Sequence, residues 1–229
     1  YTLFLGALCL IPAFFALLAT KDVQIENKQE TSSKAPALPL GLIIITALIS
    51  IFHVAGEAAA RTFFNVYMDK DLNISLSFIG LQLAGAQLVA VPAALSLPFL
   101  SSRFGIRRTV IAVTAITALL LLLMSTIPNW LAASFCFVCI MSMAALRRSS
   151  FAIFHQELVS SRWRTAMSGA TSMMSGMGYS AMALGGGYMI SFAGFPSLFL
   201  TGSVLTGIGA FLFWIYFRKD KSAGEDSNS

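Results

Sequence analysis

The sequence predicts an all-α polytopic membrane protein. Its residues are 57% hydrophobic and only 11% charged, whereas a soluble domain carries about 25% charged residues. Seven apolar segments are each long enough to cross a bilayer as a helix, which takes roughly 20 residues. A helix satisfies its own backbone hydrogen bonds in lipid, and the alternating pattern of barrel strands is absent from the sequence.

The chain starts with an apolar span and a polar linker. Residues 1–19 form the first predicted span, and because the chain begins inside this hydrophobic run we expect it to be a fragment of a longer protein. Residues 20–37 are rich in Lys, Glu, Gln and Ser. They are the only long polar interruption between spans, so they predict a boundary between two units.

Six further spans follow the linker. The second span covers residues 38–68 and would reach about 46 Å as a helix, more than the ~30 Å hydrocarbon core, so we expect its far end to project, tilt or break. Pro92 and Pro98 are predicted to kink or end the third span. The sixth is rich in Gly, Ala and Ser, which favours close helix packing. The spans after the second are residues 76–100, 109–127, 130 to either 146 or 157, 165–190 and 197–217.

Positive charges predict which side of the membrane each loop faces. Lys and Arg crowd the linker, the loops near Arg103 and Arg162, and the tail, whereas the opposite loops hold only Lys70. Cytoplasmic loops carry the excess of Lys and Arg in membrane proteins. We therefore expect a multi-pass protein of the cell (inner or plasma) membrane, with its linker and C-terminus in the cytoplasm.

Four polar residues at intervals of four interrupt the second span. They are His53, Glu57, Arg61 and Asn65. Each step of four turns a helix by only about 40°, so they form one slowly turning stripe. One hypothesis is that the stripe lines a transport path, where Glu57 exchanges a proton or binds a cationic group and Arg61 tunes its charge. The alternatives are a structural Glu57–Arg61 pair near the outer interface and a packing role for His53.

Further polar residues lie in the third and fifth spans. Arg147 and Arg148 fall in the inner half of the fifth span if its helix takes the longer course. Neighbours on a helix point about 100° apart, so we expect different roles, with at least one arginine facing an aqueous cavity and suiting an anionic substrate. The alternative is that both anchor the helix at the cytoplasmic interface, near which we also expect His155. Gln82 and Gln87 could bind substrate or hydrogen-bond a neighbouring helix.

The sequence argues against enzyme, metal or cofactor chemistry. An intramembrane enzyme needs a set such as Ser/His/Asp, two aspartates or a His-rich cluster, but the two His residues are isolated and no Asp lies inside a span. Cys136 and Cys139 lack His or Asp partners in their span, and we interpret them as small apolar residues. A P-loop is also absent, so we expect no cofactor, and uphill transport would need a proton or ion gradient.

The loop after the third span carries the most specific motif. Residues 98–108 read PFLSSRFGIRR, which is similar to G-x-x-x-D-[RK]-x-G-x-[RK]-[RK], the loop signature of major facilitator superfamily transporters. The matching residues are Arg103, Gly105, Arg107 and Arg108. The first position and Ser102 depart from the signature, so the role of its acidic residue cannot be assigned to Ser102. Gly105 allows a tight turn, and the arginines are expected to hold the loop on the anionic inner face.

Together with the span layout, this loop makes the chain resemble the second half of a major facilitator superfamily transporter. The resemblance implies the last helix of the first half (1–19), a central cytoplasmic linker (20–37), a six-helix C-terminal bundle of two inverted three-helix repeats (38–217) and a cytoplasmic tail (218–229). It implies secondary active transport of a small solute by alternating access, with proton coupling left open. A transporter-like receptor or sensor without transport is the alternative.

The expected partners follow from this resemblance. They are membrane lipid, a small solute of unknown identity and the N-terminal half of the same chain, and a proton if the transport is proton-coupled. No nucleic-acid partner is expected.

Overall fold

The chain folds into long helices in the part that the structure describes. The computed structural model describes residues 40–218; the predicted span at 1–19, the linker at 20–37 and the tail beyond Arg218 lie outside the described residues. The helices are α2 (Leu40–Lys70), α3 (Leu76–Leu95), α4 (Leu97–Phe104), α5 (Ile106–Thr126), α6 (Trp130–Leu158), the 3-10 helix η1 (Ser161–Trp163) and α7 (Arg164–Arg218). Five of the described helices are long and apolar enough to cross a membrane. The all-helical, polytopic fold class is therefore confirmed, while the inverted-repeat layout stays a prediction.

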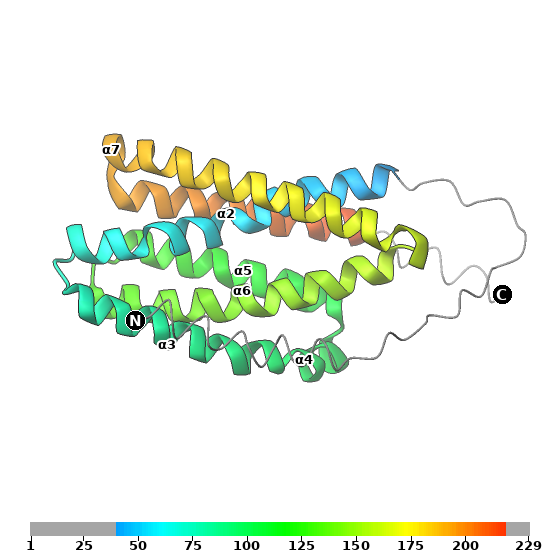
Figure 1. Ribbon diagram of the computed structural model, residues 1–229, viewed down its shortest axis with the longest axis horizontal. Coiled ribbons are helices and arrows are strands. Elements are labelled where there is room, and N and C mark those ends of the chain that lie inside the picture. Colours follow the sequence, from blue (N-terminus) through cyan, green and yellow to red (C-terminus); the bar gives the residue numbers. More distant parts are fainter. Residues whose placement is uncertain (1–39, 219–229) are drawn as a thin grey trace, which may run out of the picture. The chain divides into compact units, whose positions relative to one another are not determined.

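The helix α7 turns back on itself at Gly194. This residue has φ 76° and ψ 177°, a left-handed conformation that favours glycine, and Pro196 follows it. Figure 1 shows the two arms of α7, yellow and then orange to red, meeting at the end that carries the α7 label. The arms also touch farther along, because a Cβ at Gly186 would lie 2.8 Å from Leu198 Cδ1. The two arms therefore account for the predicted sixth and seventh spans.

Two turn residues divide the chain between α3 and α5. The predicted third span is broken at Ser96 into α3 and α4. Pro92 lies in the last turn of α3, and Pro98 lies in the first turn of α4, where its missing N–H needs no partner. Gly105, with φ 80°, then joins α4 directly to α5. The signature loop is thus a tight turn between two helices.

The helix α6 takes the longer of the two predicted courses. Its start is capped by Asn129, whose side-chain Oδ1 accepts a hydrogen bond from the Leu131 N–H at 2.9 Å. It then runs unbroken to Leu158. Arg147 and Arg148 therefore lie well inside a helix, where their side chains can reach neighbouring helices.

Small residues let α2 and α7 approach closely. A Cβ at Gly178 would lie only 2.9 Å from the backbone oxygen of Ile51, so this position cannot carry a side chain without moving the backbone of α2. Thr206, on the second arm of α7, also contacts α2, because its Oγ1 accepts a hydrogen bond from the Gly56 N–H at 3.0 Å. The ribbon of α2 accordingly lies against α7 for much of its length (Figure 1).

The close packing predicted for residues 165–190 is confined to one face of the helix. Gly178 and Gly186 meet neighbouring helices, whereas Gly169 and Gly176 have no such neighbour within 4 Å among the described residues. Both lie on the exposed side of α7. The glycine-rich composition of this segment therefore overstates how much of it is in tight contact.

The outer surface of the described helices is apolar. On α3, Leu81, Leu88 and Leu95 repeat at intervals of seven and are 68%, 73% and 74% exposed. Such a continuous apolar stripe would be unfavourable in water, but it suits a lipid or protein environment. The exposed surface therefore agrees with membrane insertion.

Substitution of two glycines on the same arm of α7 tests the α2–α7 contact. Gly178→Ala should lower the free energy of unfolding by about 1–3 kcal/mol, because its Cβ meets the backbone of α2. Gly176→Ala is the matched control and should be neutral or slightly stabilising, since its Cβ has room and alanine favours a helix. Thermal unfolding of the detergent-purified protein measures both, and equal midpoints for the two variants would contradict the contact.

Candidate functional site

A buried carboxylate lies at the middle of α2. Glu57 is only 3% exposed, and small residues surround it on its own helix, with Ala58, Ala59 and Ala60 fully buried. These alanines keep neighbouring helices close, so a long side chain from another helix can reach the carboxylate. A charge in such a place is stable only with a partner of opposite sign.

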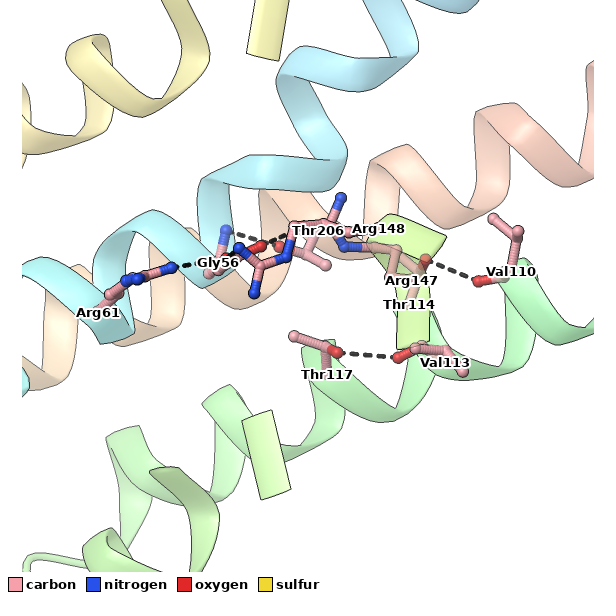
Figure 2. A network of polar contacts seen from close by, with 10 residues as sticks. Gly56, Arg61, Val110, Val113, Thr114, Thr117, Arg147, Arg148 and Thr206 are labelled. Carbon is pink, nitrogen blue, oxygen red and sulfur yellow. Dashed lines mark hydrogen bonds and ion pairs between the residues drawn. The ribbon is translucent and has the colours of Figure 1, made fainter. Parts of the chain in front are cut away.

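Three arginines supply the positive charge. The Arg147 Nη2 donates to Glu57 Oε2 in a buried contact between α6 and α2. Arg61 Nη1 and Arg148 Nη1 lie 3.7 Å and 3.6 Å from the other carboxylate oxygen, Oε1. Figure 2 shows Arg61, Arg147 and Arg148 in one network beside the Gly56–Thr206 hydrogen bond. Glu57 therefore links α2 to α6.

The burial of the three arginines differs. The Arg147 side chain is 5% exposed, whereas those of Arg61 and Arg148 are 41% and 52% exposed. The neighbours Arg147 and Arg148 thus have different surroundings, as their angular separation on the helix predicts. Arg147 is held inside the bundle, whereas Arg148 is half-exposed.

The cluster carries a formal net charge of +2, because three guanidinium groups share one carboxylate. Electrostatic interactions are stronger in a membrane interior than in water, since the effective dielectric constant is lower. The cluster therefore attracts an anion. The one carboxylate of the cluster is contacted by all three arginines.

A cavity of about 460 Å³ opens beside the cluster. Its walls come from three helices: Val54 from α2; Arg147, Arg148, Phe151, Ala152 and His155 from α6; and Ser168, Thr171, Ser172 and Ser175 from α7. Arg147 and Arg148 belong to both the cluster and the cavity. The cavity thus combines a cationic end, a row of hydroxyl groups and an apolar wall.

The predicted path residue His53 lies in an aromatic pocket. Its ring is 5.1 Å from that of Phe151 and 5.6 Å from that of Phe213, and His53 is 1% exposed. Neither ring nitrogen has a hydrogen-bond partner among the described residues. His53 therefore packs against aromatic side chains of α6 and α7, and it is not part of the cavity wall.

The remaining predicted residues lie outside the cluster. The Gln82 Nε2 donates to Ser134 Oγ and so joins α3 to α6. This contact is the hydrogen bond to a neighbouring helix that was the alternative to substrate binding. Asn65 and Gln87 are exposed and make no polar side-chain contact with other described residues. The signature arginines lie around the α4–α5 turn, where Arg103 and Arg108 are exposed and Arg107 is half-buried.

Sequence reasoning missed the α7 wall of the cavity and the burial of His155. The wall residues Ser168, Thr171, Ser172 and Ser175 have the spacing i, i+3, i+4, i+7 of one helix face. That spacing was the signal that could have identified them. His155, expected near the inner interface, is 4% exposed and packs edge-on against Phe151 with the ring centroids 3.9 Å apart.

A double-mutant cycle tests the Glu57–Arg147 ion pair. Glu57→Leu and Arg147→Leu should each lower the free energy of unfolding by about 3–5 kcal/mol, because each removes the buried partner of the other charge. The double variant should lose clearly less than the sum of the two. Arg61→Leu is the control and should cost about 1 kcal/mol or less, since Arg61 is half-exposed. Additive losses in thermal or denaturant unfolding would show that the two side chains do not interact.

Comparison with known protein families identifies the family of the chain. A family model described as the Major Facilitator Superfamily matches residues 46–229, which include almost all of the described helices. A comparison with curated proteins found no match. Members of the matched family are membrane transporters, in agreement with the five helices that can span a membrane. The chain therefore belongs to the major facilitator superfamily of membrane transporters.

Proposed function

We propose that the chain is the C-terminal half of a secondary active transporter that moves a small solute by alternating access. Family membership supports the general role, and in this fold the solute site lies near the midplane between two halves that rock against each other. The observation that carries the proposal is the buried Glu57–arginine cluster. Charged groups held inside membrane spans are typical of solute and ion pathways.

Glu57 is our candidate for the group that carries a coupling proton. It is the only buried carboxylate among the described residues. The charged groups that face it are Arg61 on its own helix and Arg147 and Arg148 on α6. A proton that binds to Oε2 neutralises the carboxylate and breaks the ion pair, which releases the Arg147 guanidinium for the solute. Loss of the proton on the other side of the membrane restores the pair and displaces the solute.

Transport measurements on a Glu57→Gln variant test this coupling. The full-length protein is placed in vesicles, and a solute is first identified by screening labelled compounds. An imposed pH gradient should drive solute accumulation by the wild type, whereas Glu57→Gln should exchange solute without responding to the gradient. Asp71→Asn, which changes an exposed carboxylate outside the cluster, should behave as the wild type. A pH response that persists in Glu57→Gln would exclude Glu57 as the proton carrier.

The same vesicles separate a transporter from a receptor. A transporter exchanges labelled solute outside for unlabelled solute inside, whereas a receptor built on the same bundle binds the solute but does not exchange it. Saturable binding without exchange would therefore contradict the proposed function.

We also propose that the protein lies in the cell membrane with the α4–α5 turn on the cytoplasmic side. The arginines near this turn and the single Lys70 on the α2–α3 side support that orientation. The same rule places the linker and the C-terminus in the cytoplasm.

Cysteine labelling tests the orientation. In a variant whose Cys9, Cys136 and Cys139 are replaced by alanine, Asp71→Cys should react with a membrane-impermeant maleimide added to intact cells. Ser102→Cys should react only after the membrane is permeabilised. The reverse pattern would invert the orientation.

A further inference from the structure

We infer that the cavity between α6 and α7 binds the oxyanion group of a small organic anion, with Arg148 as its main cationic contact. The oxyanion is a carboxylate or a phosphate carried by the solute. The biological role of this site rests on the proposed transport function, but anion binding itself can be measured separately.

The cationic end of the cavity has one arginine with free donors. Arg147 is engaged by Glu57 in a buried ion pair. Arg148 is 52% exposed and approaches Glu57 only at 3.6 Å, so most of its five N–H donors are not used by the carboxylate. The cavity wall contains no Asp or Glu that could neutralise it. A guanidinium in this setting binds a carboxylate or phosphate well, since two of its N–H groups can donate in parallel.

Hydroxyl groups line the α7 wall of the cavity. The Thr171 hydroxyl donates to the Met167 carbonyl oxygen of its own helix at 2.9 Å. The hydroxyls of Ser168, Ser172 and Ser175 have no hydrogen-bond partner within the part of the chain that the structure describes. Three unused donors on one helix face, in a cavity that an arginine also lines, are suited to the oxygens of an anion.

A buried nitrogen in the α6 wall of the cavity lacks a partner. His155 is 4% exposed, and its Nε2 makes no hydrogen bond among the described residues. A buried polar atom without a partner is unfavourable, so its presence in a cavity wall points to a ligand. In the tautomer that carries hydrogen on Nε2, His155 donates to an oxyanion in the same way as the serines.

The rest of the wall indicates that the anion is organic. Val54, Phe151 and Ala152 contribute an apolar surface to the cavity. An inorganic anion would make no apolar contact with this surface. An organic anion could bury its hydrocarbon part against the surface, and removing that part from water favours binding. The headgroup of an anionic phospholipid presents the same oxyanion chemistry, and the experiment separates that source from a soluble solute.

Binding of four probes of similar size and different charge tests the site. Tritiated benzoate is bound to the purified full-length protein in phosphatidylcholine nanodiscs and competed with phenyl phosphate, benzamide or benzylamine. Benzoate should bind saturably, phenyl phosphate should displace it, and the neutral and cationic probes should not. Arg148→Gln should weaken benzoate binding on the order of ten- to one-hundred-fold, and Arg148→Lys should recover part of the loss.

Matched variants distinguish the site from a general charge effect. Arg103→Gln removes the same charge from an exposed position at the end of α4 and should leave benzoate binding unchanged. Ser168→Ala combined with Ser172→Ala should weaken binding several-fold. No saturable benzoate binding, equal displacement by benzylamine, or wild-type affinity in Arg148→Gln would each overturn the inference. Loss of benzoate binding when the nanodiscs contain phosphatidylglycerol would show that a lipid headgroup occupies the site. It would overturn the inference that the bound anion is a soluble solute.

Exchange measurements separate failure of this site from failure of the proposed function. If anions bind in an Arg148-dependent way but none is exchanged across vesicle membranes, the site is supported and transport is contradicted. If anions are exchanged equally by the wild type and Arg148→Gln, transport is supported and the site is overturned.

Discussion

The ion pair between Glu57 and Arg147 constrains how α2 and α6 pack inside the bundle. Both charges are buried, so each is stable only while the other stays within reach. This requirement fixes the position of α2 along α6. It also explains the small residues around Glu57, because larger side chains would hold the two helices apart. The tight contact at Gly178 then positions α7 against the other side of α2, so one polar interaction and one close approach locate three helices.

The same ion pair also gives the adjacent residues Arg147 and Arg148 different roles. Both arginines line the cavity, but Arg147 is engaged by the carboxylate, so Arg148 is the one with most of its N–H donors free. The difference comes from the helix itself, since neighbouring side chains point about 100° apart. In the proposed mechanism, protonation of Glu57 removes its negative charge, which raises the formal net charge of the cluster from +2 to +3 and releases the Arg147 guanidinium. The pair and the anion site would thereby be coupled directly, because Arg147 belongs to both the ion pair and the cavity wall.

The fold could be predicted from the sequence far better than the site. Hydropathy and the residues Pro92, Pro98 and Gly105 locate the helices and their breaks, because these are local properties of the chain. The i,i+4 rule also identifies Arg61 as a neighbour of Glu57, and the two lie 3.7 Å apart. The buried partner Arg147 is 90 residues away in sequence, and no periodicity predicts a contact between helices. The serine row of α7 has a visible helical spacing, but its glycine-rich surroundings favoured a packing interpretation.

The excess positive charge gives the proposed site a means of responding to its solute. A net charge of +2 held within a membrane protein is unfavourable unless an anion or water compensates it. An anion bound beside Arg148 would lower that cost, so the empty and occupied cavities differ in electrostatic free energy. A solute shifts a conformational equilibrium only by as much as it binds one state better than another. If the proposed alternating access closes the cavity around the anion, it removes competing water and strengthens the attraction, so an occupied cavity favours the closed state.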